Sequence, residues 1–262
     1  MYIRALNLLL VGALFLFLLA PVLMVFPISF SGDNFISWPP SSWGLRWYRA
    51  LLQQPQLTAA LFNSLTLAAI VTALSLVIGL MVAFLIVRYP FRGRDAVMSM
   101  LTLPLVLPSI VLGLGMLMLF SQRGWTGSWT GLLIAHMTVT LPYTIRILTT
   151  SLMTLPAGIE AAASSLGASP MRVLVHVTVP LIASGVTAAG ALSFLISFDE
   201  VVISLFVVGP RLSTFPVELF RMVEERSDPL PAAISVVLVL ATIVVVLLLE
   251  RLVGLRRAIS HG

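Results

Sequence analysis

The sequence predicts an all-α membrane protein with six transmembrane helices and both termini in the cytoplasm. The chain has 262 residues, of which 59% are apolar and only 10% charged, whereas an ordinary soluble domain carries about 25% charged residues. Its mean hydropathy is +1.09. The apolar residues form continuous runs of about 20 residues, the length that a helix needs to cross a bilayer. Strands of a membrane β-barrel would instead alternate apolar and polar residues over about 10 positions.

The six apolar runs define the predicted spans, and we expect the whole chain, residues 1–262, to form one membrane domain with a core of about residues 60–250. The first run is a retained span rather than a signal peptide, because no small-residue cleavage site follows it. Ser42 to Leu52 should form a short helix along the membrane surface. Prolines in the third and fourth runs should kink those spans. The runs cover residues 8–30, 61–87, 97–120, 131–151, 181–208 and 232–249.

Arginines near the span ends predict the orientation, because basic residues are enriched on the cytoplasmic side. The two densest clusters, Arg88 to Arg94 and Arg251 to Arg257, fall on the same side of the predicted membrane, as does Arg4. We therefore place both termini, and the segment between the fourth and fifth spans, in the cytoplasm.

The composition also limits the chemistry. The chain contains no Cys, which excludes disulfides, thiolate metal sites and Cys nucleophiles. All 15 basic residues are Arg, so the lysine of a P-loop nucleotide site is absent as well. Because the arginines are scattered among apolar runs as topology signals, we expect no nucleic-acid partner. We also expect no metal site and no catalytic residue.

The cytoplasmic segment, residues 152–180, has the pattern of two short helices. Pro156 suits the first turn of the first helix. Gly167 suits the position just past its end, where φ is positive. Between them, apolar residues recur at helical spacing on one face: Ile159, Ala163 and Leu166.

Ser169 and Pro170 should be the N-cap and first residue of the second helix, which Pro180 ends. A free cytoplasmic loop needs no such sharp corner between two helices. The small apolar face therefore favours docking into a groove on another protein. The alternative is a surface helix that packs back on the membrane domain.

Glu160-Ala161-Ala162, followed by Gly167 and Pro180, resembles the EAA loop of permease subunits of binding-protein-dependent ABC importers. We refer to residues 152–180 as the EAA loop. The resemblance implies a type I ABC importer permease fold, in which this loop is the coupling helix that fits a cleft in a separate ATPase. It also implies that the chain is not an enzyme and binds no cofactor, since ATP and Mg belong to the ATPase. The implied ATPase-coupling residues are Glu160, Ala161, Ala162, Ala163, Leu166, Gly167 and Ala168.

Further motifs resemble the second permease subunit of the spermidine/putrescine branch of this family. They are Phe-Asn-Ser-Leu at 62–65, Ser-Phe-Asp-Glu-Val-Val at 197–202, Gly-Pro at 209–210 and Thr-Phe-Pro at 214–216. The implied substrate is a small cationic polyamine. Because relatives in this branch also move opines or aminophosphonates, another amine-bearing or amino-acid-like solute is the alternative.

Two carboxylates, Asp199 and Glu200, fall in the outer half of the fifth predicted span. A charge in hydrocarbon costs at least about 2.5–3.5 kcal/mol, so such residues usually face a cavity, a partner or an opposite charge. On one continuous helix, Glu200 shares a face with Ser193, Ser197 and Ser204, while Asp199 points about 100° away. We expect this stripe to line the substrate pathway and Asp199 to meet a neighbouring helix or the partner subunit. The alternative is that both carboxylates cap the span near the outer interface.

A second polar stripe, His136, Thr140 and Tyr143, follows helical spacing in the fourth span. Tyr143 could hold an ammonium group through a cation–π contact. Thr140 and Tyr143 therefore join the predicted pathway. The alternative is that these residues are packed and hydrogen-bonded within the helix bundle.

The predicted function is that of the transmembrane subunit of an ATP-driven importer in the bacterial inner membrane, working by alternating access. One chain supplies half a pathway, so a second permease subunit is expected. The family resemblance favours a heterodimer and also implies two ABC ATPase subunits and a periplasmic or extracellular substrate-binding protein. An intramembrane hydrolase would need a Ser beside a base or facing aspartates on two spans. A passive channel would need a repeated polar ring. Neither pattern is visible in the sequence.

Overall fold

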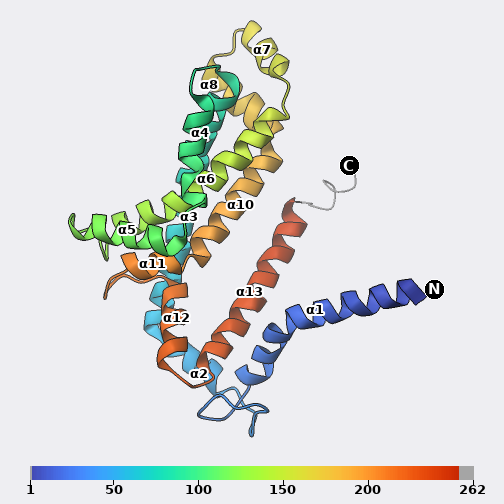
Figure 1. The fold of residues 1–262 in the computed structure, drawn as a ribbon, viewed down its shortest axis with the longest axis vertical. Coiled ribbons are helices and arrows are strands. Elements are labelled where there is room, and N and C mark those ends of the chain that lie inside the picture. Colours follow the sequence, from blue (N-terminus) through green and yellow to red (C-terminus); the bar gives the residue numbers. More distant parts are fainter. Residues whose placement is uncertain (1, 254–262) are drawn as a thin grey trace. The chain divides into compact units, whose positions relative to one another are not determined.

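The computed structural model describes the backbone of residues 2–253 and the side chains of residues 7–244. Within that range the regular structure consists of helices and one isolated β-bridge between Ser31 and Trp43. The helices form two compact units (Figure 1). The core unit is Gln56–Phe220, and the terminal unit is made of the chain before and after it.

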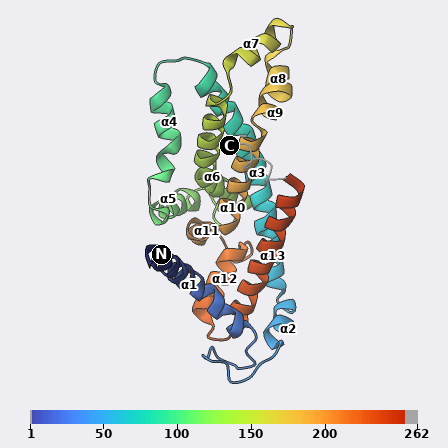
Figure 2. The same cartoon turned by 90° about the vertical axis from the view of Figure 1, so that its right-hand side faces the viewer.

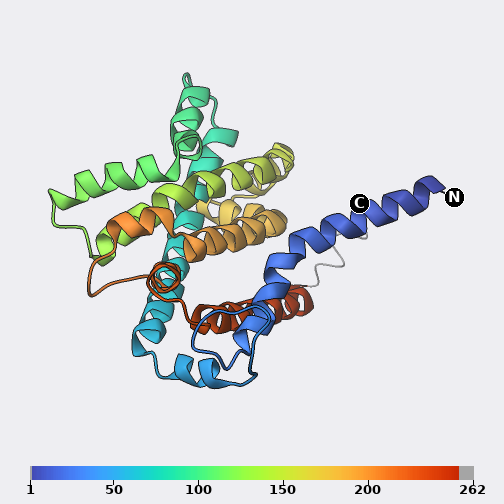
Figure 3. The ribbon, with the colours of Figure 1, turned by 60° about the horizontal axis from the view of Figure 1, so that its bottom comes forward.

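The terminal unit contains α1 (Tyr2–Ser29), the short α2 (Arg46–Leu52) and α13 (Leu230–Val253). Helix α13 contacts both α1 and α2, and Figure 3 shows α1 in blue meeting α13 in red. Helix α2 confirms a short helix after the first span, although it begins at Arg46 and not at Ser42. Its placement along the membrane surface stays a prediction. The connection from α1 to α2 is organised around Asp33, whose carboxylate accepts hydrogen bonds from three serines, Ser37, Ser41 and Ser42.

The core unit is built on three long helices: α3 (Pro55–Arg88), α6 (Trp129–Met153) and α10 (Ala183–Asp199). Helices α6 and α10 lie side by side in Figures 1 and 3. Glycines allow two close approaches: a Cβ at Gly185 would lie 1.9 Å from the Ser151 hydroxyl, and one at Gly79 would lie 2.8 Å from the Thr144 methyl.

Shorter helices complete the core unit. They are α4 (Arg94–Thr102), the 3₁₀ turn η1 (Leu103–Leu105), α5 (Ser109–Ser121), α7 (Ala157–Ser165), α8 (Pro170–Val173), the π-helical turn η2 (Leu174–Thr178), α9 (Val179–Leu181) and α11 (Val202–Val207). Helix α12 (Phe215–Glu225) crosses the boundary between the units. In Figure 2, α7 and α8 lie together at one end of the core unit.

Two apolar clusters hold the core unit together. One joins Leu67 and Val71 of α3 to Leu132 of α6 and Ile203 of α11. The other joins Ala83 of α3 to Leu148 of α6 and Ala189 of α10, nearer the EAA loop. Within the described part of the chain, these side chains are almost wholly buried.

The six apolar runs are helical, but two of the predicted spans are not continuous. Among the residues that the structure describes, three helices are long and apolar enough to cross a membrane: Asn7–Ser29, α3 and α6. The number rises to five if each of two bent pairs is one span. The sixth run falls on α13. The number of six spans therefore stays a prediction. The cytoplasmic placement of both termini also stays a prediction, and the side chains of Arg4, Arg251, Arg256 and Arg257, on which it partly rests, lie outside the described residues.

The third predicted span is divided by a 95° bend between α4–η1 and α5. Pro108 has extended backbone angles, φ −58° and ψ 132°, and immediately precedes α5. Proline lacks the N–H that would continue the helix and restricts the residue before it. The expected kink at Pro104 and Pro108 is therefore a complete change of direction, whereas α6 runs through Pro142 as one helix.

The expectation of one helix over residues 181–208 is wrong. The chain bends by 82° between Pro170–Leu181 and Ala183–Asp199, and it breaks again at Glu200, where φ is −71° and ψ is 106°. The Glu200 carboxylate accepts a hydrogen bond from the amide of Ile203 at 2.9 Å. This contact supplies a partner for a free N–H of α11, which stabilises a new helix start. The apolar sequence around it conceals the break from hydropathy.

Candidate functional site

The first helix of the EAA loop ends in a sharp corner at Gly167. Helix α7 begins at Ala157, so Pro156 is its N-cap residue and lies just before the first turn in which it was predicted, and Gly167 has φ +86°. The amide of Gly167 bonds to the carbonyl of Ser164 at 3.0 Å, and the amide of Ala168 bonds to that of Ala163 at 3.3 Å. This pair of bonds is the Schellman motif, which requires a left-handed residue at the glycine position. The predicted position of Gly167, just past the helix end with positive φ, is confirmed, and its contact with the ATPase stays a prediction.

The second helix of the EAA loop starts where the sequence predicts. Ser169 is the N-cap residue and Pro170 the first residue of α8, although the Ser169 side chain makes no capping bond. The helical run continues through η2 and α9 and ends at Leu181, one residue after Pro180. The loop is therefore a helix–corner–helix unit that α10 follows after the 82° bend.

The structure separates the predicted ATPase-coupling residues into two groups. Leu166 is 90% exposed, and the exposed surface continues over Ala161, Ala162 and Gly167. Ala163 and Ala168 are half-buried. Glu160, in contrast, is only 8% exposed. The corner thus presents small and apolar groups, while the one carboxylate of α7 points into the protein.

Glu160 is held by two elements of the same chain. One carboxylate oxygen pairs with Nε of Arg88 at 2.5 Å, and the other accepts the hydroxyl of Thr178 at 2.7 Å. Arg88 ends α3 and also donates to the carbonyls of Leu152 and Leu155 at 3.3 and 3.0 Å. Sequence reasoning missed Arg88 and Thr178, because the pairing depends on how α3, α6 and η2 meet in space.

A buried polar cluster joins the long helices of the core unit. His136 contacts the hydroxyl of Ser197 through Nδ1 at 2.9 Å and that of Ser204 through Nε2 at 3.0 Å. Ser204 donates its proton to the carbonyl of Glu200 at 2.8 Å, so it accepts from His136. The network therefore assigns the ring proton to Nε2, and Nδ1 accepts from Ser197.

The same cluster continues along α6 toward the EAA loop. Thr144 and Ser193 share a hydrogen bond of 2.5 Å, and Thr140 and Ser75 share one of 3.1 Å. All the hydroxyl residues of this cluster are at most 3% exposed. Ser75 and Thr144 were not predicted. Thr144 follows Thr140 at the spacing of one helical turn, which is the one sequence signal that could have found it.

The residues of the two predicted pathway stripes differ in how far they are exposed. Ser193, Ser197 and Ser204 are buried within the core unit beside His136 and Thr140, as interhelical hydrogen-bond partners. Glu200 is partly exposed and does not share a continuous helix face with Ser193 and Ser197, because α10 ends before it. Asp199 is exposed, and Tyr143 is 37% exposed although Thr140 is buried. Contact of any of these residues with a substrate stays a prediction.

Two of the motifs that carry the family resemblance meet in space. The side-chain amide of Asn63 donates to the carbonyl of Ser213 at 3.2 Å. The amide of Phe215 donates to the hydroxyl of Ser64 at 2.8 Å. The Asn-Ser-Leu segment of α3 therefore holds the start of α12 through its polar side chains.

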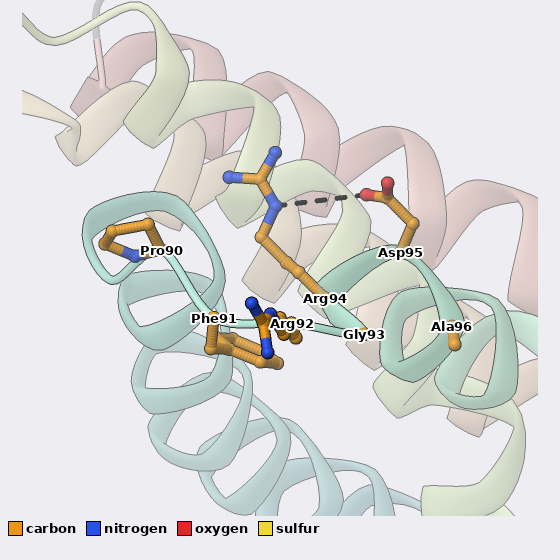
Figure 4. A pocket seen from close by; sticks show the side chains of 7 residues that line it. All are labelled: Pro90, Phe91, Arg92, Gly93, Arg94, Asp95 and Ala96. Atoms are coloured by element: carbon orange, nitrogen blue, oxygen red, sulfur yellow. Dashed lines mark ion pairs between the residues drawn. The ribbon is translucent and has the colours of Figure 1, made fainter.

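A pocket lies in the turn between α3 and α4 (Figure 4). Its lining residues are Pro90–Ala96. Gly93 has φ +86°, and Arg94 donates to the carbonyl of Ile86 at 3.4 Å. Arg94 also lies 3.9 Å from the carboxylate of Asp95 (Figure 4). Among the described side chains, no group of three His, Asp and Glu could hold a metal ion.

The known proteins that this chain resembles are membrane components of transport systems. Residues 75–257 match the family described as binding-protein-dependent transport system inner membrane component. The chain is 34% identical over 227 residues to the putrescine transport system permease protein PotI of Escherichia coli (strain K12), covering 82% of this chain and 79% of that protein. It is 32% identical over 233 residues to the spermidine/putrescine transport system permease protein PotC of Haemophilus influenzae, covering 88% and 90%.

A protein named for 2-aminoethylphosphonate transport, PhnV of Salmonella typhimurium, is 33% identical over 195 residues, with 74% of each chain covered. Among solved structures, the fold resembles a chain of a bacterial ABC transporter involved in the import of the acidic polysaccharide alginate. The TM-score is 0.77 at 16% identity, with 95% of this chain and 96% of that chain covered.

Proposed function

The chain belongs to the family of binding-protein-dependent transport system inner membrane components and has the type I fold of ABC importer permeases, and we propose that it moves a small polyamine such as putrescine or spermidine. The polyamine would cross the bacterial inner membrane, driven by a separate ATPase that docks on the EAA loop. The chain itself is non-catalytic. ATP and Mg bind to the ATPase.

The observation that carries this proposal is the shape and exposure of the EAA loop. A glycine corner with a Schellman motif holds α7 in a fixed orientation. Leu166 stands almost fully exposed on that corner, next to the small side chains of Ala161 and Ala162. An exposed apolar group on a rigid helix end favours insertion into a groove of a partner protein.

The polyamine substrate rests on the relatives and on the acidic residues near the break at Glu200. PotI and PotC, named for putrescine and for spermidine/putrescine transport, match most of this chain at 31–34% identity. Glu200 is partly exposed and Asp199 is exposed, so both carboxylates are open to contact from a cation. In this chain, Glu200 then has two roles: it caps α11 and offers negative charge to a polyamine.

Alternating access would use the rigid and broken parts of the core unit differently. The buried hydroxyls of α6 and α10 tie these helices into one body. The helix interruptions at Ile182 and Glu200 would serve as the hinges of this movement. Closure of the ATPases would move the EAA loop, and the long helices would follow as a rigid group.

The proposed assembly has several partners, since a single permease chain provides half of a pathway. They are a second permease subunit in a heterodimer, two ABC ATPase subunits and an external substrate-binding protein. A second candidate substrate is an aminophosphonate, because PhnV shares 33% identity with the chain. Opines and amino-acid-like solutes share the amine that the carboxylates would bind.

The test is ATP-driven uptake by the reconstituted complex in proteoliposomes. We expect the complex to accumulate labelled putrescine or spermidine when ATP and the binding protein are supplied, and to accumulate no 2-aminoethylphosphonate. Preferential uptake of the aminophosphonate would select the second candidate. ATP hydrolysis by the isolated chain, or the absence of ATP-dependent uptake for every amine, would refute the proposed function.

A further inference from the structure

We propose that Arg88 is a positioning residue that transmits the movement of the EAA loop to helices α3 and α6 through its ion pair with Glu160. The inference rests on the proposed function, because it concerns how the docked loop moves the membrane helices. It assigns Glu160 a role inside the chain and leaves contact with the ATPase to the exposed residues of the corner.

The geometry places one side chain at a junction of four segments. Arg88 is the last residue of α3. Its Nε pairs with Glu160 of α7 at 2.5 Å, and its Nη2 reaches the carbonyls of Leu152 and Leu155 at 3.3 and 3.0 Å. Thr178 of η2 completes the junction with a 2.7 Å hydrogen bond to Glu160.

Burial makes this junction stiff. The Arg88 and Glu160 side chains are 14% and 10% exposed, so water cannot readily replace either partner. Losing one member of such a pair leaves the other charge buried without compensation. Arginine is also suited to the position, because its planar fork can serve a carboxylate and backbone carbonyls at the same time. Lysine has a single charged nitrogen and could not span both.

The position of Glu160 on α7 explains why the pair can transmit movement. The exposed surface over Ala161, Ala162 and Leu166 lies on one side of the helix, and Glu160 is turned inward. A partner that pushes on the exposed side of α7 therefore displaces Glu160 on the opposite side, and with it the ion pair to Arg88. Because Arg88 also holds the end of α6, the displacement reaches α3 and α6 together.

The experiment compares Arg88→Gln, Glu160→Gln and the charge swap Arg88→Glu with Glu160→Arg in the full reconstituted importer. Co-purification of the ATPase, ATP hydrolysis and uptake per ATP hydrolysed are measured for each. We expect both single variants to retain the ATPase and to hydrolyse ATP, with uptake per ATP reduced at least about fivefold, a typical size for coupling between sites. The swap should recover part of the lost uptake per ATP. Arg88→Lys should give an uptake per ATP that is higher than that of Arg88→Gln but lower than that of the native protein.

A matched control is Arg92→Gln, which removes an exposed arginine from the turn after α3, outside the EAA loop. It should leave uptake per ATP unchanged. If a single variant fails to fold, the swap and Arg88→Lys still decide, because each keeps a charge at the junction.

Two results would overturn the inference. Normal uptake per ATP in Arg88→Gln would show that the ion pair transmits nothing. Loss of the ATPase from Glu160→Gln but not from Arg88→Gln would make Glu160 a direct docking contact. The proposed function fails separately, in the wild-type complex, if that complex shows no ATP-dependent uptake. In that case transmission through Arg88 fails with it.

Discussion

At the scale of single residues, the hydroxyl groups around His136 link neighbouring helices through hydrogen bonds. Ser197 and Ser204 satisfy both ring nitrogens, and the Ser204 hydroxyl donates a hydrogen bond to the Glu200 carbonyl. The serine spacing was visible in the sequence, and so was His136. The sequence did not show that these serines face His136 across α6, α10 and α11, because a helical wheel describes one helix and not the residues opposite it.

Replacing Ser197 with Ala should destabilise the protein by about 1–3 kcal/mol, because Nδ1 of His136 would stay buried without a hydrogen-bond donor. The measurement is the thermal unfolding midpoint in detergent. Ser184→Ala is the matched control, since Ser184 is exposed at the start of the same helix. Equal midpoints for the two variants would show that the buried contact contributes nothing.

Asp33 allows a prediction on pH, because it lies in the connection between α1 and α2. Hydrogen bonds from the Ser41 side chain, then from Ser37, the Ser41 amide and Ser42, hold the pKa of Asp33 below its usual range. Because the pKa of Asp33 is lowered in the folded loop, the ionised carboxylate stabilises the loop, and this stabilisation is fully present above the ordinary carboxyl pKa. The stabilisation is lost only as pH falls through the lower, folded value.

We therefore expect the Ser41 amide, which donates to Asp33 at 2.8 Å, to stay protected from hydrogen exchange at about pH 4, where an ordinary aspartate is half protonated. Asp33→Ala should remove this protection at every pH. Loss of protection in the native protein between about pH 5 and pH 4 would contradict the lowered pKa.

At the scale of elements, the helix ends show which parts of the fold the sequence predicts and which it does not. The EAA loop could be predicted almost residue by residue, because Pro156, Gly167 and Pro170 each restrict the backbone in a known way. The break at Glu200 could not, because the surrounding run is largely apolar apart from Asp199 and no proline or glycine marks the break. At the break, the Glu200 carboxylate accepts a hydrogen bond from the amide of Ile203 in the first turn of α11, a contact that the composition of the run does not predict.

Gly167→Ala should slow ATP-driven uptake, because a side chain at φ +86° costs about 1–2 kcal/mol in the corner. Gly158→Ala is the matched control on the same loop. Neither glycine has an atom within 4 Å of an added Cβ, so the two variants differ only in backbone conformation. Similar uptake rates for both would show that the corner tolerates rearrangement.

Gly185→Ala should destabilise the packing of α10 on α6, because the new Cβ would lie 1.9 Å from the Ser151 hydroxyl. Overpacking of this kind costs about 1–3 kcal/mol. The thermal midpoint in detergent should fall, and Ser151→Gly in the same chain should raise it again. Gly115→Ala, where nothing lies within 4 Å, should have little effect. A fall that Ser151→Gly leaves unchanged would point to another cause.

At the scale of the whole molecule, much apolar surface is left for lipid and for partner chains. In the terminal unit, Leu8, Phe15 and Phe17 of α1 are 74%, 61% and 77% exposed. In the core unit, Ile110 and Met118 of α5 are 63% and 62% exposed. Composition predicted the membrane environment, since contiguous apolar surface of this extent is incompatible with water. It could not say which part faces lipid and which part a second permease, because both partners are apolar.

Protection of Leu166 by the ATPase tests the central claim most directly. The chain has no native cysteine, so Leu166→Cys gives a single labelling site at the most exposed point of the corner. Leu52→Cys, at a position that is 86% exposed in the terminal unit, is the control. We expect the ATPase to block maleimide labelling at Leu166→Cys and to leave labelling at Leu52→Cys unchanged. Equal labelling of Leu166→Cys in the free chain and in the complex would contradict docking on the EAA loop.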